Sequence, residues 1–120
     1  MQEKMETKNH VQRAAHAWPI LTETASRKMV VTYKELGNQI GIHYRAVKHP
    51  LELIQQYCLQ NRLPPLTILV VNQGGTPGEG FIAWNVEDLE EGLEKVYSFP
   101  WKHIENPFEY AREGITDESL

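Results

Sequence analysis

Apolar residues recur at helical spacing in three segments of the chain. In the first, residues 7–24, they fall three or four positions apart, which predicts an amphipathic helix that is bent or interrupted at Pro19. Its apolar face consists of Val11, Ala14, Ala15, Trp18 and Leu21. A second stripe, expected to be buried, consists of Leu51, Ile54, Cys58 and Leu59. The third segment, residues 86–97, predicts an acidic amphipathic helix. Its inward-facing residues are expected to be Leu89, Leu93 and Val96.

The segment between the first two stripes carries the signals of a short helix and a turn. Thr32 and Glu35 have the spacing of a capping box, which predicts a helix start after residues 26–31, a basic turn and a short extended run. Gly37 and Gly41 are expected to bracket the end of that helix. Residues 42–47 then predict a turn and the start of a second helix, at helix-turn-helix spacing. His49 and Pro50 either interrupt that helix or begin a third.

A run of β-prone residues follows the helical half of the chain. Residues 66–71 form the most strand-like segment, and we expect a central strand there. Residues 72–80 contain four glycines and Pro77, which predict a loop. Residues 81–84 then predict a return strand, so that a hairpin or wing would form. Residues 99–108 are aromatic and interrupted by proline.

The order of these elements resembles the C-terminal, winged-helix DNA-binding domain of alkylguanine-DNA alkyltransferases and the non-catalytic alkyltransferase-like proteins. The similarity covers residues 18–84 and rests on collinear motifs. These are Trp18 with Leu21, the Val-Thr-Tyr-x-x-Leu-Gly block of residues 31–37, Ile40-Gly41, Arg45-Ala46-Val47, Asn61 with Pro64, Val70-Val71, and Gly80-Phe81. The resemblance implies an α+β fold, a mostly helical winged helix-turn-helix with a small β-hairpin or sheet. It also implies a function in binding double-stranded DNA, with recognition of a modified or flipped base.

The resemblance assigns roles to individual positions. Tyr33 would press on a phosphate beside the target nucleotide, and Arg45 would enter the duplex and fill the space of a flipped base. Asn61 would hold the hinge between recognition helix and pocket. The expected DNA-binding residues are Tyr33, Lys34, Arg45, Arg27, Lys28, Tyr44 and Lys48. The expected pocket residues are Asn61, Thr67, Gly80, Phe81 and Trp84.

The chain differs from this family at the position of the family's reactive motif. The reactive Pro-Cys-His-Arg motif would fall within residues 66–71, which read Leu-Thr-Ile-Leu-Val-Val. These residues supply neither a thiol nor an imidazole to activate one, so we expect no alkyl transfer and no enzyme activity. Cys58 lies on a helix stripe and is expected to be a small core residue. The stretch between Arg45 and Asn61 is longer than in the family and contains Pro50.

Composition sets the outer limits of these expectations. The 120 residues favour a single domain, with an ordered core over residues 11–108 and loose ends at residues 1–8 and 109–120. We expect no metal site, because the chain has one cysteine and its five histidines lack paired ligand spacing. We expect no cofactor either, because the glycine loop lacks the Gly-Lys-Ser/Thr of a phosphate-binding loop. The polar start and the lack of a long apolar run favour a cytoplasmic protein without membrane contact.

Charge divides the chain into two unlike halves and leaves alternatives open. Residues 1–63 hold nine Lys/Arg and five Asp/Glu, whereas residues 64–120 hold three and eleven, for a net charge of −4. A protein-interaction adaptor for a DNA-processing enzyme, using the acidic helix and the aromatic C-terminal segment, is therefore the main alternative to DNA binding. An enzyme with Glu79 and a histidine in a pocket is the second.

Overall fold

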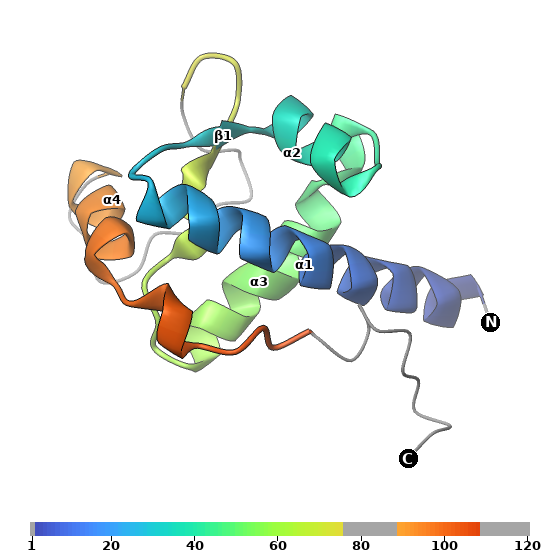
Figure 1. Ribbon diagram of the computed structural model, residues 1–120. Helices are drawn as coiled ribbons and strands as arrows, with labels where there is room; N and C mark the ends of the chain where they lie inside the picture. The colour runs from blue at the N-terminus through green and yellow to red at the C-terminus, as the bar shows by residue number, and fades with distance from the viewer. Residues whose placement is uncertain (1, 76–88, 109–120) are drawn as a thin grey trace.

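A mostly helical fold surrounds one short parallel sheet. The computed structural model describes residues 2–75 and 89–108, and in the first helix it describes side chains from residue 9 onward. The elements of the described residues are α1 (Gln2–Ser26), β1 (Val31–Thr32), α2 (Tyr33–Ile40), the 3-10 helix η1 (Tyr44–Ala46), α3 (Lys48–Gln60), the 3-10 helix η2 (Leu66–Leu69), β2 (Val70–Val71), α4 (Leu89–Ser98) and the 3-10 helix η3 (Trp101–His103) (Figure 1).

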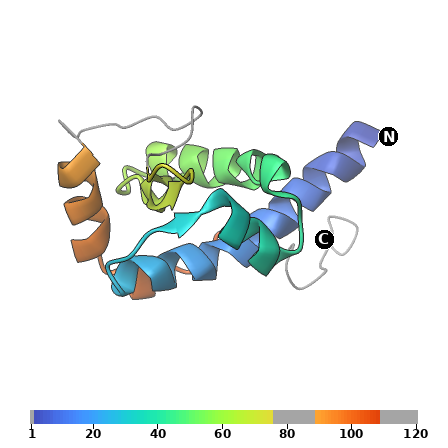
Figure 2. The ribbon, with the colours of Figure 1, turned by 90° about the horizontal axis from the view of Figure 1, so that it is seen from above.

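Helix α1 is the axis on which the other elements pack. It contacts α3, η2, α2 and α4 along its length. Figure 2 shows α1 and α3 on either side of η2 and the sheet, with α4 at one end. The buried side chains of α1 are small except at Trp18 and Leu21, so neighbouring helices approach closely. The helix continues through Pro19, so of the two expectations there the interruption is wrong and the bend stays a prediction.

The strand expected at residues 66–71 is confirmed only at its end. Val70 and Val71 pair in parallel with Val31 and Thr32, whereas Leu66–Leu69 form a 3-10 helix. All six residues of the run are buried. Burial on every side makes a 3-10 turn and a strand look alike in sequence, which is why the pattern gave the wrong element. The expected return strand at residues 81–84 lies outside the described residues.

The helical stripes are confirmed at most positions, and two positions, Leu59 and Leu89, are wrong. Ile54, Cys58 and Val96 are buried. Leu59 is 47% exposed, because it lies about 100° around α3 from Cys58. Leu89 is 43% exposed at the first residue of α4, although its spacing predicts the inner face. Spacing assigns a face but does not say how far the packing partners extend along the helix.

The turn after α2 leads into α3 through a 3-10 helix. The second helix expected from residues 42–47 is limited to Tyr44–Ala46, and α3 begins at Lys48. Pro50 lies in the first turn of α3, where its missing N–H costs no hydrogen bond. Of the two expectations for His49 and Pro50, the start of a new helix is confirmed.

The aromatic C-terminal segment packs on the core. Trp18 makes edge contacts with Tyr57 and Trp101, each at 5.8 Å between ring centroids. Trp101 is buried and donates its indole N–H to the Val96 carbonyl at 2.8 Å. Phe108 lies against Trp18 and Tyr57. These rings close the α1–α3 interface and are not left as an exposed patch.

Candidate nucleic-acid interface

The start of α2 is fixed by its own side chains. The Thr32 hydroxyl accepts from the Glu35 amide, and the Glu35 carboxylate accepts from the Thr32 amide, each at 3.0 Å. The capping box is thus confirmed. These hydrogen bonds, that from the Thr32 backbone above all, lower the pKa of Glu35, so its carboxylate stays ionised. Tyr33, the first residue of α2, is half-buried against the core, while Lys34 is exposed.

Two glycines shape the end of α2 and the turn that follows. Gly41 caps the helix in the left-handed conformation, with φ of 78°. A side chain at Gly37 would place its Cβ 2.8 Å from the Ile42 carbonyl oxygen and 3.3 Å from the Tyr44 Cα. Gly37 therefore lets the turn lie directly on α2. The Gly37 carbonyl accepts the Ile42 amide at 2.9 Å, which holds the turn in place.

The turn presents three stacked side chains to solvent. The rings of His43 and Tyr44 lie 4.5 Å apart and are tilted by 30°. The Arg45 guanidinium carbon lies 5.8 Å from the centroid of the Tyr44 ring, and its Nε donates to the Tyr44 hydroxyl at 3.3 Å. His43 Nδ1 accepts from the Arg45 amide at 3.1 Å and so caps η1. We refer to His43, Tyr44 and Arg45 as the turn triad.

Within residues 2–75 and 89–108, no acidic side chain neutralises the charge of Arg45. Among the residues that the structure describes, Arg45 forms no ion pair, and Glu35, an obvious candidate, is engaged in the capping box. Lys48, three positions on, is exposed at the first residue of α3. The N-terminus of α3 has no side-chain cap, and uncapped helix N-termini favour anions. The region is therefore suited to a polyanion.

The seven expected DNA-binding residues fall in two places. Tyr44, Arg45 and Lys48 surround the turn after α2, and Tyr33 and Lys34 begin that helix. Arg27 and Lys28 instead follow the C-terminal end of α1. Arg27 Nε donates to the Glu23 carboxylate at 2.9 Å, so it is already paired. The structure thus brings only part of the expected basic surface to the turn.

The expected pocket residues are described only in part. Thr67 is buried in η2, and its hydroxyl has no hydrogen-bond partner within the described part of the chain. Asn61 is exposed at the end of α3 and donates from Nδ2 to the Tyr57 carbonyl at 2.8 Å. Gly80, Phe81 and Trp84 lie outside the described residues.

Cys58 contacts the start of η2, in an environment that does not favour a nucleophile. It is fully buried, and a hydrogen bond joins it to the backbone of Leu66. Burial raises the pKa of the Cys58 thiol to about 11, against the smaller lowering effect of that hydrogen bond. A thiol of this kind carries almost no thiolate near neutral pH, so the expected core role is confirmed.

A contact between two histidines was not foreseen from sequence. His49 of α3 stacks on His10 of α1, with centroids 4.5 Å apart and planes inclined by 8°. This stack ties the start of α3 to α1 beside Lys48. Sequence spacing gave no signal for it, because the residues are far apart and neither lies in a motif. No cluster of three or more metal-ligating side chains occurs in the part of the chain that the structure describes.

Comparisons with protein-family models, curated proteins and solved structures give no match to this chain. None of the described helices is both long enough and apolar enough to cross a membrane.

Proposed function

We propose that the protein is a non-catalytic DNA-binding protein that uses α2, the following turn and α3 as a helix-turn-helix unit within a winged-helix fold. The observation that carries this proposal is the turn triad, in which an exposed arginine, without an acidic partner among the described residues, lies over an exposed tyrosine. Tyr44 is 44% exposed although it is a large ring. Such a planar, cationic projection is suited to nucleic acid.

Different side chains would contact the backbone and the bases of DNA. Lys34 and Lys48 would contact phosphates, which supply most of the sequence-independent affinity and its salt dependence. Arg45 and Tyr44 would supply planar surfaces that stack on an unpaired base or occupy the space that a flipped base leaves. Because the triad is already stacked, little side-chain freedom would be lost on binding.

The absence of catalysis in this proposal follows from the residues at η2. By the resemblance, the family's reactive motif would fall within residues 66–71, which hold neither cysteine nor histidine, and the nearby Cys58 thiol is buried and protonated. Binding would therefore mark or protect a site on DNA without altering it covalently.

Fluorescence anisotropy with a labelled duplex tests the proposal at moderate salt. We expect Arg45→Ala and Lys48→Ala to weaken binding about 10-fold each, which corresponds to about 1.4 kcal/mol. Lys102→Ala is the matched control, because it removes an exposed cation from η3, on another part of the surface. Equal losses in all three variants would mean that binding follows net charge alone and would refute the assignment to the turn.

Base capture has a separate test. A mismatched or abasic position lowers the cost of extruding a nucleotide, which is otherwise a few kcal/mol. We expect the protein to prefer a duplex with a central mismatch over its perfect counterpart, and Tyr44→Ala to abolish that preference. Equal affinity of the wild type for both duplexes would leave helix-turn-helix binding intact and remove base capture.

A further inference from the structure

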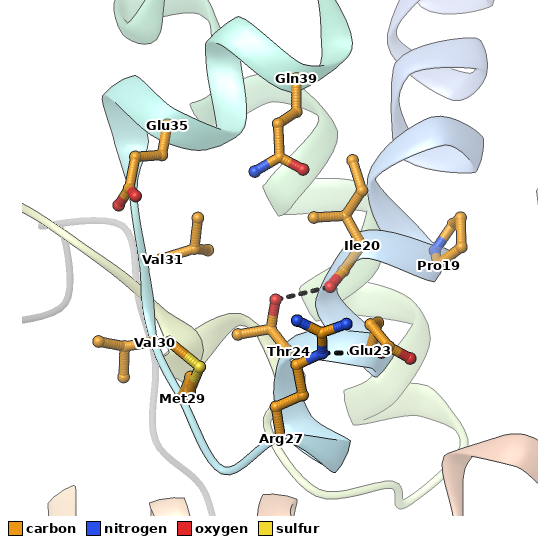
Figure 3. Close-up of a pocket in the computed structure, with 10 residues that line it drawn as sticks. All are labelled: Pro19, Ile20, Glu23, Thr24, Arg27, Met29, Val30, Val31, Glu35 and Gln39. Atoms are coloured by element: carbon orange, nitrogen blue, oxygen red, sulfur yellow. Dashed lines mark hydrogen bonds and ion pairs between the residues drawn. The ribbon is translucent and has the colours of Figure 1, made fainter.

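An open groove separates α1 from the β1–α2 segment. It has a volume of about 480 Å³ and lies beside the C-terminal half of α1. Figure 3 shows Ile20 and Thr24 of α1 on one side and Val31 on the other. Of the expected DNA-binding residues only Arg27, which is paired with Glu23, lines the groove, and the turn triad does not.

The groove is bordered by an exposed apolar ridge, Met29 and Val30. Met29 is 56% exposed and Val30 is 44% exposed, the former being the highest value among the large hydrophobic side chains of the described residues. Two adjacent exposed apolar residues beside a partly apolar groove are typical of a protein contact surface.

The ridge is held rigidly. The Met29 amide donates to the Thr24 carbonyl at 3.1 Å, and the Met29 carbonyl accepts from the Tyr97 hydroxyl at 3.2 Å. Lys28, just before it, has a φ of 56°, a left-handed conformation that is costly for a residue with a Cβ. A preformed ridge loses little conformational entropy when it is buried by a partner.

Charges of opposite sign lie at the two ends of the groove. Arg27, with its partner Glu23, lies at one end of the groove, and the ionised carboxylate of Glu35 lies at the other (Figure 3). A second copy related by a two-fold axis through the groove would bring each Arg27 to the partner's Glu35. It would also lay each apolar ridge on the partner's groove.

We propose that this face is the interface of a homodimer, with a second copy of the chain seated in the groove. A closed two-fold dimer requires that the same patch supply both the projecting and the receiving surface, and the residues that line the groove supply both. This inference does not depend on DNA binding. If both hold, the dimer would carry two turn triads, one from each copy.

Sedimentation equilibrium on the full chain measures the association directly. We expect a monomer–dimer equilibrium in the wild type, with Met29→Asp weakening it at least 10-fold. Leu59→Asp is the matched control, because Leu59 is similarly exposed but lies on α3, outside the groove, and this variant should associate like the wild type. Far-UV circular dichroism confirms that each variant is folded.

A charge exchange then identifies the geometry. Arg27→Glu and Glu35→Lys each place like charges together in a homodimer, so each variant alone should associate at least 10-fold more weakly than the wild type. Mixed together, the two restore both opposite-charge pairs, and we expect a heterodimer. A wild type that stays monomeric at high concentration, even if it binds a basic, apolar peptide from another protein, overturns the proposal. So does a mixture that associates no better than its components.

Discussion

Asn106 donates a hydrogen bond from Nδ2 to the Ala15 carbonyl at 2.8 Å, across 91 positions of sequence. The Ala15 carbonyl is the one to which the residue-19 amide would donate in an ordinary helix, and Pro19 has no amide hydrogen. The side chain of Asn106 therefore replaces the bond that proline removes. It also attaches the C-terminal segment to α1, beside the Trp18 and Phe108 rings.

Asn106→Ala should destabilise the protein by about 1–2 kcal/mol, because it leaves a partly buried carbonyl without its partner. In a Pro19→Ala background the residue-19 amide can donate to the Ala15 carbonyl, so the same substitution should cost much less. Urea unfolding of the four proteins of this double-mutant cycle measures the coupling. Equal costs in the two backgrounds would show that Asn106 does not compensate for Pro19.

Thr67→Val should stabilise the protein by about 1 kcal/mol. The Thr67 hydroxyl is buried without a partner among the described residues, and valine has nearly the same shape without that polar atom. Thr67→Ser retains the hydroxyl and loses a methyl group, so it should destabilise. Urea midpoints compare the three proteins, and a destabilised valine variant would mean that the hydroxyl has a partner.

Gly37→Ala should displace the turn triad. Its Cβ would collide with the Ile42 carbonyl, which is backbone and cannot rotate away, so we expect a loss of about 2 kcal/mol or more. Gly41→Ala is the control. Its Cβ meets open space, so the only expected loss of stability comes from the left-handed φ and is about 1 kcal/mol. Thermal unfolding measures stability, and anisotropy at a temperature where both variants are folded should show the larger loss of DNA affinity for Gly37→Ala.

Cys58 should make stability fall at alkaline pH. Its pKa is raised from 9.0 to about 11 by burial, so the folded state retains the thiol proton where the unfolded state has lost it. The resulting stabilisation is fully present below pH 9 and is lost as the pH rises towards 11, on the order of 2 kcal/mol in total. Urea unfolding from pH 8 to 11 should show a shallower decline for Cys58→Ala. Identical declines in the two proteins would contradict the burial of the thiol.

Local signals in the sequence predicted local structure well. Thr32, Glu35 and Gly41 define the ends of α2 through bonds and dihedral angles within a few residues, and each is where the pattern placed it. The buried Cys58 followed from helical spacing in the same way.

What the sequence did not predict depends on distant contacts. Asn106 lies far from Ala15 in sequence, and the His10–His49 stack joins two separate helices. Leu66–Leu69 are buried on all sides, which removes the alternation that distinguishes a strand. One missed contact is local: Arg27 is paired with Glu23, four positions earlier and about one helical turn away, a spacing that gave a usable signal.

The central claim is that the turn between α2 and α3 binds DNA, and an NMR titration of the full chain with a short duplex tests it most directly. The account predicts the largest amide shift changes at residues 41–48 and at Lys34, with weakening of all changes as salt is raised. Shift changes confined to α4, or none at all at low salt, would contradict it.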